Sequence, residues 1–208
     1  MDEITYLEVP FEDKEKVKSL GARWHSERKK WFVPKGLDTG PFENWLPIYD
    51  EHASQKAISP FYLLQSTELC WKCDKPSEVI TFASHGTIDI ESDERSEGLT
   101  KYLYVSFLPE RLRVYLDLHF KSYYLDYSAT TDSFYYMNHC QHCKAPLGDF
   151  FMHSEPEGAF FPISAEMSAD ISITRLKESG FVKISASESY GGVIEHILEN
   201  GQVKEFQP

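Results

Sequence analysis

The chain has 208 residues, of which 41% are hydrophobic and 14% aromatic, and this is ample for a globular core. Its formal net charge of -12 disfavours binding of a phosphate backbone over a broad face, since that requires Lys and Arg to neutralise the phosphates. No apolar run approaches the roughly 20 residues of a membrane helix, and the amino end lacks the basic and apolar regions of a secretion signal. We therefore expect a cytoplasmic protein without membrane contact.

The acidic excess is unevenly distributed along the chain. Residues 1–48 carry 8 basic and 9 acidic side chains, which leaves 13 basic and 24 acidic ones after them. This difference predicts a small α/β unit over residues 1–48 and a larger domain over residues 61–208. Residues 49–60 between them are polar, lack periodicity and end at Pro60, so we expect a linker there.

The first unit carries the pattern of a short β-α-β-β fold. Residues 4–9 alternate as a strand before Pro10, and residues 12–20 form a helix pattern with acids first and lysines later. Residues 22–24 and 30–33 flank a polar hairpin loop, which predicts two more short strands.

Three short motifs in this unit resemble a known family. They are Tyr-Leu-x-Val-Pro-Phe at residues 6–11, Leu-Gly-Ala-x-Trp at residues 20–24 and Lys-x-Trp-x-x-Pro at residues 29–34. Together they resemble, over residues 5–47, a small bacterial domain of unknown function that is found attached to conjugative plasmid primases and other DNA-processing proteins. The resemblance implies an association with DNA, with RNA or with the processing enzyme itself.

Basic and aromatic side chains alternate around the predicted hairpin. Such interleaving suits single-stranded nucleic acid, through phosphate contacts and base stacking. The candidate contacts to nucleic acid or a partner are Arg23, Trp24, His25, Arg28, Lys29, Lys30 and Trp31. In the alternative interpretation, both tryptophans belong to the core of the unit and the lysines only keep the hairpin soluble.

The second unit is predicted to be α+β and mainly antiparallel, with a zinc ribbon and an inserted helix. Residues 89–98 are acidic and are expected to form an exposed loop, which could bind a cation or be a plain solvated segment. The predicted strands are residues 61–64, 79–83, 102–107 and 148–153, and the predicted helices are residues 109–120 and 193–199.

Four cysteines form two C-x-x-C steps, at Cys70 and Cys73 and at Cys140 and Cys143. In a cytosolic protein this pairing suggests a metal rather than disulfides, because thiols stay reduced there. Zinc takes four such thiolates in a tetrahedron, so the sequence predicts one structural zinc. Four cysteine ligands leave no open coordination position, which argues against catalysis at the metal. The 66 residues between the pairs, 74–139, would form a folded insertion inside the metal loop.

Several alternatives remain open for the cysteines. Iron bound as in rubredoxin has similar ligand spacing, a redox-active dithiol is a further possibility, and the thiols could be unconnected. His139 and His142 are adjacent to cysteines and could substitute for one of them.

Residues 68–162 also resemble an uncharacterised bacterial family of the zinc-ribbon type. The resemblance is carried by Cys-Trp-Lys-Cys from residue 70, Met-Asn-His-Cys-Gln-His-Cys from residue 137 and Gly-Asp-Phe-Phe-Met-His from residue 148. It implies a metal site and no known activity.

A polar group after the second cysteine pair is a further candidate for chemistry outside the metal site. On a strand, Asp149 and His153 would share a face, and with Glu155 they could form a hydrolytic or second metal site. The sequence favours the simpler interpretation, in which these residues form a solvated strand edge and turn. No phosphate-binding glycine loop, H-E-x-x-H helix or G-x-S-x-G elbow is present.

These observations favour a non-enzymatic zinc-binding protein that acts as a binding or adaptor module. Its first unit would contact nucleic acid or a DNA-processing partner, and its acidic domain would contact protein. One alternative is an acidic inhibitor or immunity-type protein aimed at a basic target, because complementary charge speeds encounter. Another is an enzyme with an unrecognised site.

Overall fold

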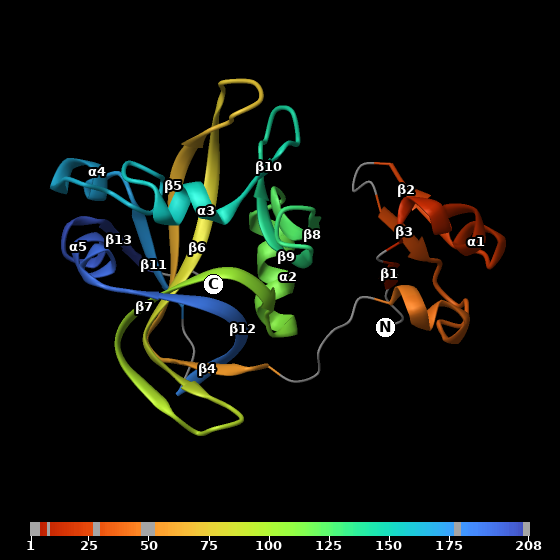
Figure 1. Cartoon of the computed structure of the whole chain (residues 1–208), viewed down its shortest axis with the longest axis horizontal. Helices are drawn as coiled ribbons and strands as arrows, with labels where there is room; N and C mark the ends of the chain where they lie inside the picture. Colours follow the sequence, from red (N-terminus) through yellow and green to blue (C-terminus); the bar gives the residue numbers. More distant parts are fainter. Residues whose placement is uncertain (1–4, 8, 27–29, 47–52, 177–179, 206–208) are drawn as a thin grey trace. The chain divides into compact units, whose positions relative to one another are not determined.

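The structure is a computed structural model that describes residues 5–7, 9–26, 30–46, 53–176 and 180–205. The chain divides into two compact units, Met1–Glu51 and His52–Pro208, called unit 1 and unit 2 below (Figure 1). Both combine helices with mostly antiparallel sheets, as an α+β fold requires. Within the described ranges, no helix combines the length and the apolar character needed to cross a bilayer.

Unit 1 has the predicted β-α-β-β order, with a shorter helix than the sequence suggested. Its three strands form an antiparallel sheet in the order β1-β3-β2. The predicted helix over residues 12–20 begins as a 3-10 turn and continues as α1 to Ser19; Gly21 follows it, and its φ of +104° suits glycine. The elements are β1 (Thr5–Leu7), η1 (Phe11–Asp13), α1 (Lys14–Ser19), β2 (Arg23–His25), β3 (Lys30–Val33) and η2 (Gly40–Trp45).

The core of unit 1 lies on one face of this sheet. Leu7 and Val33 on the strands are buried together with Val17 of α1 and with Phe42 and Trp45 of η2. These contacts place α1 and η2 against the same sheet face. The apolar residues of one face are thereby removed from water, which is the main favourable term for so small a unit.

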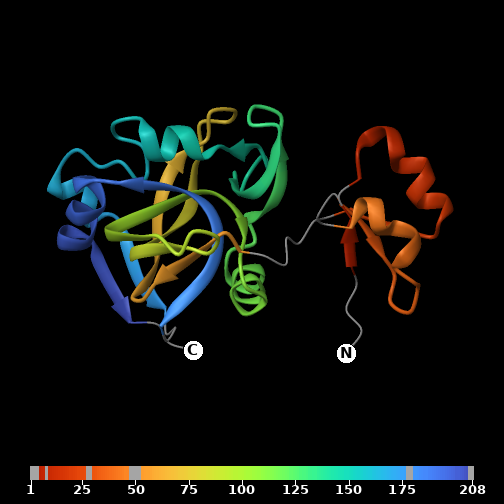
Figure 2. The same cartoon turned by 60° about the horizontal axis from the view of Figure 1, so that its bottom comes forward.

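Unit 2 is built on a strongly curved sheet of seven strands in the order β13-β11-β5-β6-β4-β12-β7 (Figure 2). The long β6 also pairs with β7, so β6, β7, β12 and β4 form a closed ring of antiparallel pairs. The strands are β4 (Gln55–Ile58), β5 (Phe61–Leu69), β6 (Pro76–Asp89), β7 (Arg95–Phe107), β11 (Ser172–Leu176), β12 (Phe181–Tyr190) and β13 (Gln202–Glu205).

A second, three-stranded antiparallel sheet and four helices complete the described part of unit 2. The small sheet has the order β10-β9-β8, and β9 contacts both β6 and β7 of the main sheet. Helices α4 and α5 pack against each other (Figure 1). The elements are β8 (Tyr123–Ser128), β9 (Ser133–His139), β10 (Pro146–Leu147), α2 (Glu110–His119), α3 (Asp149–Ser154), α4 (Ala165–Ala169) and α5 (Gly192–Asn200).

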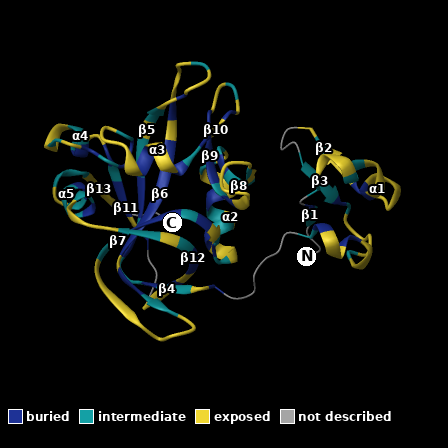
Figure 3. Cartoon of the chain, viewed as in Figure 1, coloured by how far each residue is buried: buried dark blue, intermediate teal, exposed yellow. Residues whose placement is uncertain are grey.

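Two apolar clusters fill unit 2. One surrounds the stacked rings of Phe61 and Phe82 and takes in Leu112 and Leu116 of α2. The other contains Phe160, residues of α5 and all four cysteines. Figure 3 shows the buried stretches running along the middle of β5 and β6, whereas the turn between β6 and β7 is exposed.

Four sequence predictions for unit 2 are corrected. Within the predicted linker 49–60, residues 55–58 form β4 in the main sheet, and residues 49–52 lie outside the described part. The predicted insertion 74–139 supplies β6 and β7 to the main sheet, so it is not an appendage. The acidic loop is shorter than predicted, since β7 already begins at Arg95. The predicted strand 148–153 is helix α3, because its buried residues follow a helical spacing.

Candidate metal centre

The two C-x-x-C steps lie at the turns of two hairpins. Cys70 and Cys73 stand between β5 and β6, where Leu69 pairs with Pro76. Cys140 and Cys143 stand between β9 and β10, whose first pair joins residues 139 and 146. The two turns lie side by side in Figures 1 and 2, although 66 residues separate them in the sequence.

The two turns share the same backbone geometry. The N–H of Asp74 donates to the Cys70 carbonyl at 2.9 Å, and the N–H of Lys144 donates to the Cys140 carbonyl at 2.9 Å. Asp74 and Lys144 occupy the equivalent position and have φ of 54° and 61°, in the left-handed region. Each turn therefore curls tightly enough to present both of its sulfurs on one side.

The four sulfurs converge on one point. The Sγ atoms of Cys70 and Cys143 are 3.5 Å apart, those of Cys73 and Cys140 are 3.6 Å apart, and all four lie within 4.8 Å of one another. A tetrahedral ion with metal–sulfur bonds of about 2.3 Å places its ligands about 3.8 Å apart. A disulfide would need about 2.0 Å, and the four thiols are free. Within the described ranges, no other group of three or more candidate ligands comes together.

Hydrogen bonds to sulfur favour the thiolate of Cys140. The Ser77 hydroxyl lies 3.3 Å from its Sγ, and the backbone N–H groups of His142 and Cys143 lie 3.4 and 3.5 Å from it. Burial raises the pKa of this thiol, but these donors outweigh the effect and lower the pKa to about 5. Ser77 is itself buried on β6, and only its place near the first cysteine turn could have indicated its role from the sequence.

Cys73 is shifted in the opposite direction. The backbone N–H of Lys75 lowers its pKa, but burial and hydrogen bonds with the other three sulfurs raise it to about 12. Four thiolates in contact repel one another, so the group retains protons unless a cation compensates the charge. A divalent ion would allow all four sulfurs to bind as thiolates, with release of protons.

Direct contacts join the two hairpins beside the sulfurs. Trp71 Nε1 donates to the carbonyl of Pro146 at 2.9 Å, and His142 Nε2 donates to the carbonyl of Pro76 at 3.1 Å. The two carbonyls occupy equivalent positions, three residues after the second cysteine of each pair. Each hairpin is thus held to the start of the other hairpin's second strand.

Neither histidine beside the cysteines faces the sulfurs as a ligand. The His139 ring is buried, lies 3.0 Å from Asp126 Oδ2 and stacks on Tyr124 with ring centroids 3.8 Å apart. The His142 ring is engaged at the Pro76 carbonyl. The geometry therefore favours the set of four cysteines over a set in which a histidine replaces one of them.

Asn138 on β9 forms hydrogen bonds with a part of β6 that has a neighbouring strand on one side only. Its buried side chain accepts from the N–H of Ile80 and donates to the carbonyl of Ile80, both at 2.9 Å. The amide thereby replaces the neighbouring strand that β6 lacks at this point. Together with the cysteine group, it positions the small sheet against the main one.

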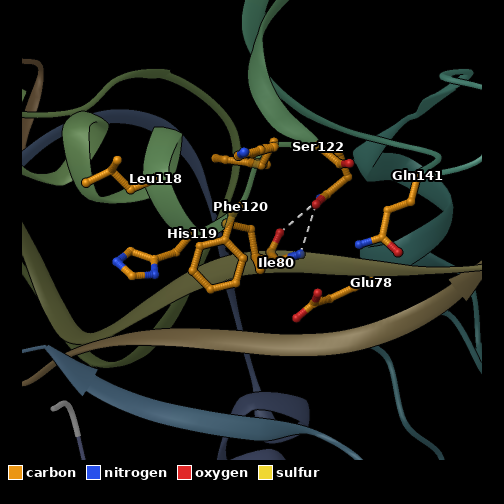
Figure 4. Close-up of a pocket in the computed structure, with 10 residues that line it drawn as sticks. Glu78, Ile80, Leu118, His119, Phe120, Ser122 and Gln141 are labelled. Atoms are coloured by element: carbon orange, nitrogen blue, oxygen red, sulfur yellow. Dashed lines mark hydrogen bonds between the residues drawn. The ribbon is translucent and has the colours of Figure 1, made fainter.

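A pocket of about 230 Å³ lies beside the metal centre, between the end of α2, β6 and the second cysteine turn (Figure 4). Glu78 on its floor accepts a hydrogen bond from the side chain of Gln65 at 2.6 Å. The pocket is lined by Glu78, Ile80, Leu118, His119, Phe120, Lys121, Ser122, Tyr123, Asn138 and Gln141.

The predicted polar site of Asp149, His153 and Glu155 takes a different form. Asp149 and His153 lie one turn apart on α3 and are both buried, whereas Glu155 is exposed. The three do not line the pocket beside the metal centre. The expected solvated strand edge is wrong, because α3 turns these two polar side chains inward.

The two buried side chains of α3 sit beside β7. Asp149 Oδ2 accepts the backbone N–H of Tyr104 at 2.6 Å, and burial raises the pKa of this carboxyl to about 7. Burial and the nearby Lys101 lower the pKa of His153. Lys101 donates to the Phe160 carbonyl at 2.7 Å, and burial lowers its pKa to about 8. This arrangement ties α3 and the loop after it to β7.

The candidate contacts of unit 1 are divided between the two faces of its sheet. Trp24 and Trp31 are cross-strand neighbours, with ring centroids 5.6 Å apart, and Trp31 packs against the core of the unit. Arg23, His25 and Lys30 lie on the opposite face. Arg28 and Lys29 lie outside the described residues.

Tyr6 and Phe32 also share the face of Arg23. Phe32 lies in the predicted hairpin beside the basic residues, whereas the sequence did not connect Tyr6 with this face. Tyr6 pairs with Phe32 across β1 and β3, and Phe32 pairs with Arg23 across β3 and β2. Alternation within each strand indicates which of its residues share a face, but only the pairing of β1 with β3 places Tyr6 on the face of Arg23.

Comparison with known proteins identifies part of unit 1. Residues 5–47 match the family described as "Domain of unknown function (DUF5710)". Two Escherichia coli proteins described as "DNA primase TraC" are similar to part of the chain. One is 34% identical over 73 residues, which is 35% of this chain and 5% of that protein. The other is 51% identical over 43 residues, which is 21% of this chain and 4% of that protein.

These matches confirm the resemblance of residues 5–47 to a domain associated with conjugative primases. The chain spans only about a twentieth of the length of the curated relatives it matches. No solved structure matches the chain. The resemblance over residues 68–162 stays a prediction from its motifs.

Proposed function

We propose that the chain is a non-catalytic binding module, in which a structural zinc site shapes unit 2 and unit 1 contacts nucleic acid or a protein that processes it. The observation that carries the first half is the convergence of four cysteine sulfurs within 4.8 Å. Zinc is favoured because it accepts four thiolates in a tetrahedron, and the separations of 3.5 and 3.6 Å suit that geometry.

The site supports a structural role more strongly than a catalytic one. A catalytic zinc keeps a position open for water or substrate, whereas four protein ligands close the coordination shell. Each of the four cysteines sits in a hairpin turn, and the two hairpins come from different sheets. Holding these turns together is therefore the role that the cysteines are placed to perform.

X-ray absorption at the zinc edge tests this assignment on the purified full chain. We expect four sulfur neighbours at about 2.3 Å and no oxygen or nitrogen neighbour. An oxygen or nitrogen atom bound to the metal would contradict a closed site of four cysteines and would indicate chemistry at the metal. If the sample absorbs at the iron edge and not at the zinc edge, the bound metal is iron, and the structural role of the site is unchanged.

The second half of the proposal rests on unit 1. Its family accompanies proteins described as DNA primases, although the family description assigns no function. The aligned region is a small fraction of those proteins, so their catalytic activity is not carried over to this chain. Association with a nucleic acid, or with a protein bound to one, is the property that such a small accessory unit can provide.

A second candidate is binding of a basic protein by unit 2. Residues 49–208 hold 24 acidic and 13 basic side chains, and this balance favours a partner of opposite charge. Affinity capture from native lysate, with and without nuclease, separates the two candidates. Partners that are lost on nuclease treatment support association with nucleic acid. A single basic protein that stays bound after nuclease treatment, in an amount equal to that of the chain, supports the second candidate.

A further inference from the structure

One face of the unit 1 sheet gathers aromatic and basic side chains. The register places Tyr6 opposite Phe32, Phe32 opposite Arg23, and His25 opposite Lys30. Cross-strand partners project from the same face, so these five residues share one side of the sheet. We call this side the aromatic face.

The layer that buries the core lies on the other side of the sheet. Leu7, Trp31 and Val33 alternate with the residues of the aromatic face and pack with α1 and η2. The rings of Tyr6 and Phe32 are half-buried, and Arg23 is exposed. The aromatic face is thus not the one that α1 and η2 cover, and its rings remain partly accessible.

Three rings of the aromatic face form a contiguous group. The ring centroids of Tyr6 and His25 are 6.0 Å apart, those of Tyr6 and Phe32 are 6.2 Å apart, and those of His25 and Phe32 are 6.2 Å apart. Each ring therefore braces the other two, which limits the side-chain entropy that would be lost when a ligand stacks on them.

The side of the sheet that α1 covers carries both signs of charge, since α1 holds Lys14, Lys16 and Lys18 beside Glu15. Among the described residues of unit 1, the acidic side chains lie on η1, on α1 and in residues 38–43. The described part of the aromatic face carries Arg23, Lys30 and His25 and no acidic residue. This side can accept a phosphate, although the chain as a whole carries a charge of -12.

We infer that the aromatic face binds single-stranded nucleic acid, with bases stacked on Tyr6, His25 and Phe32 and phosphates at Arg23 and Lys30. The inference rests on the proposed association of unit 1 with nucleic acid, and it names the surface and the class of ligand. Aromatic side chains on a sheet bind unpaired bases because every base offers a flat face for stacking. In a duplex these faces are already stacked, so the rings cannot reach them.

The small number of cations defines the expected salt dependence. Each phosphate contact on a single strand contributes about 0.7 to the slope of log affinity against log salt. Two contacts give a slope of about -1.4, shallow for a nucleic-acid protein, because stacking supplies the remaining affinity. A Lys30→Gln variant should bring the slope to about -0.7.

Fluorescence anisotropy of the full chain with a labelled 20-nucleotide thymidine strand at low salt is the test. We expect Phe32→Leu and Tyr6→Leu each to weaken binding roughly 10-fold, since each change removes one stacking surface. The matched control is Phe11→Leu, which removes an exposed ring that lies on η1 beneath Lys14 and outside the aromatic face. The control should bind as the wild type does.

Circular dichroism and the melting temperature of every variant establish that it is folded. Arg23→Gln serves as a second variant, because Arg23 is exposed and lies outside the core of the unit. Binding unchanged in Phe32→Leu, Tyr6→Leu and Arg23→Gln would overturn the inference, as would an equal loss in Phe11→Leu. A duplex bound as tightly as the single strand would also overturn it.

Failure of this inference is distinguishable from failure of the proposed function. If the strand does not bind but the full chain still retains a nucleic-acid-processing protein from lysate, the inference is wrong and the proposed function stands. If zinc is absent from the same sample, the proposed structural metal site fails, whatever the anisotropy shows.

Discussion

Replacing Cys140 with serine perturbs the point where the two hairpins of unit 2 meet. The sulfur of Cys140 lies 3.6 Å from that of Cys73 and receives hydrogen bonds from Ser77, His142 and Cys143. Serine keeps the size of the side chain but provides a poor ligand for zinc. We therefore expect the variant to lose the metal while its hairpin sequences remain otherwise unchanged.

The size of the effect follows from the length of chain that the cysteines close. Cys73 and Cys140 enclose 66 residues, and a cross-link over such a loop stabilises the folded state by roughly 4 kcal/mol through chain entropy. In a unit of this size 1 kcal/mol corresponds to about 2–4 °C in melting temperature. Loss of the metal should thus lower the midpoint of unit 2 by about 10 °C.

Differential scanning calorimetry of the zinc-loaded wild type, the chelator-treated wild type and Cys140→Ser measures this shift. The matched control is His142→Ala, which changes the neighbouring residue and loses only the bond to the Pro76 carbonyl. It should keep the metal and melt within a few degrees of the wild type. Equal midpoints for the wild type with and without chelator would refute the reasoning, because the metal would then carry no folding energy.

Three further changes probe the packing of unit 2. Burial raises the pKa of Asp149 from 3.8 to about 7, so wild-type stability falls as pH rises between these values. Asp149→Asn should then stabilise the protein at pH 8, by up to about 4 kcal/mol, and change little near pH 4. Asn138→Ala leaves the N–H and carbonyl of Ile80 unpaired and should cost about 2–4 kcal/mol in urea unfolding. Lys144→Gly relieves a left-handed backbone and should raise stability by up to about 1 kcal/mol, seen as a higher melting temperature.

Each of these predictions has a result that contradicts it. Equal stabilisation by Asp149→Asn at pH 4 and pH 8 would show that ionisation of the buried Asp149 carboxyl does not destabilise the wild type. Gln65→Ala, which removes an exposed hydrogen bond to Glu78, is the control for Asn138→Ala and should cost under about 0.5 kcal/mol. A similar loss of stability in both variants would show that the hydrogen bonds between Asn138 and Ile80 do not contribute more than an exposed one. A lower melting temperature for Lys144→Gly would mean that the φ of 61° carries no strain there.

The sequence predicted the parts of the fold that short-range patterns determine. The helix over residues 109–120 appears as α2, because Leu112 and Leu116 recur at helical spacing after a proline. The cysteine pairs came together as their spacing predicted, since a C-x-x-C turn already sets two ligands at the right separation.

What the sequence could not predict depends on contacts between distant segments. Residues 55–58 look polar and irregular, yet they form β4 because β6 and β12 offer them two pairing edges. The apolar run after Asp149 was predicted as a strand, but the burial of Met152 and His153 together with Asp149 follows the spacing of a helix. Tyr6 joined the aromatic face only once β1 was paired with β3.

Native mass spectrometry of the purified full chain, without added metal or chelator, counts the ions that the four cysteines hold. We expect one zinc ion per chain, and loss of that ion in both Cys70→Ser and Cys140→Ser, which alter different hairpins. A wild-type mass without metal, or a zinc ion that survives both substitutions, would contradict the convergence of the four sulfurs on a single ion.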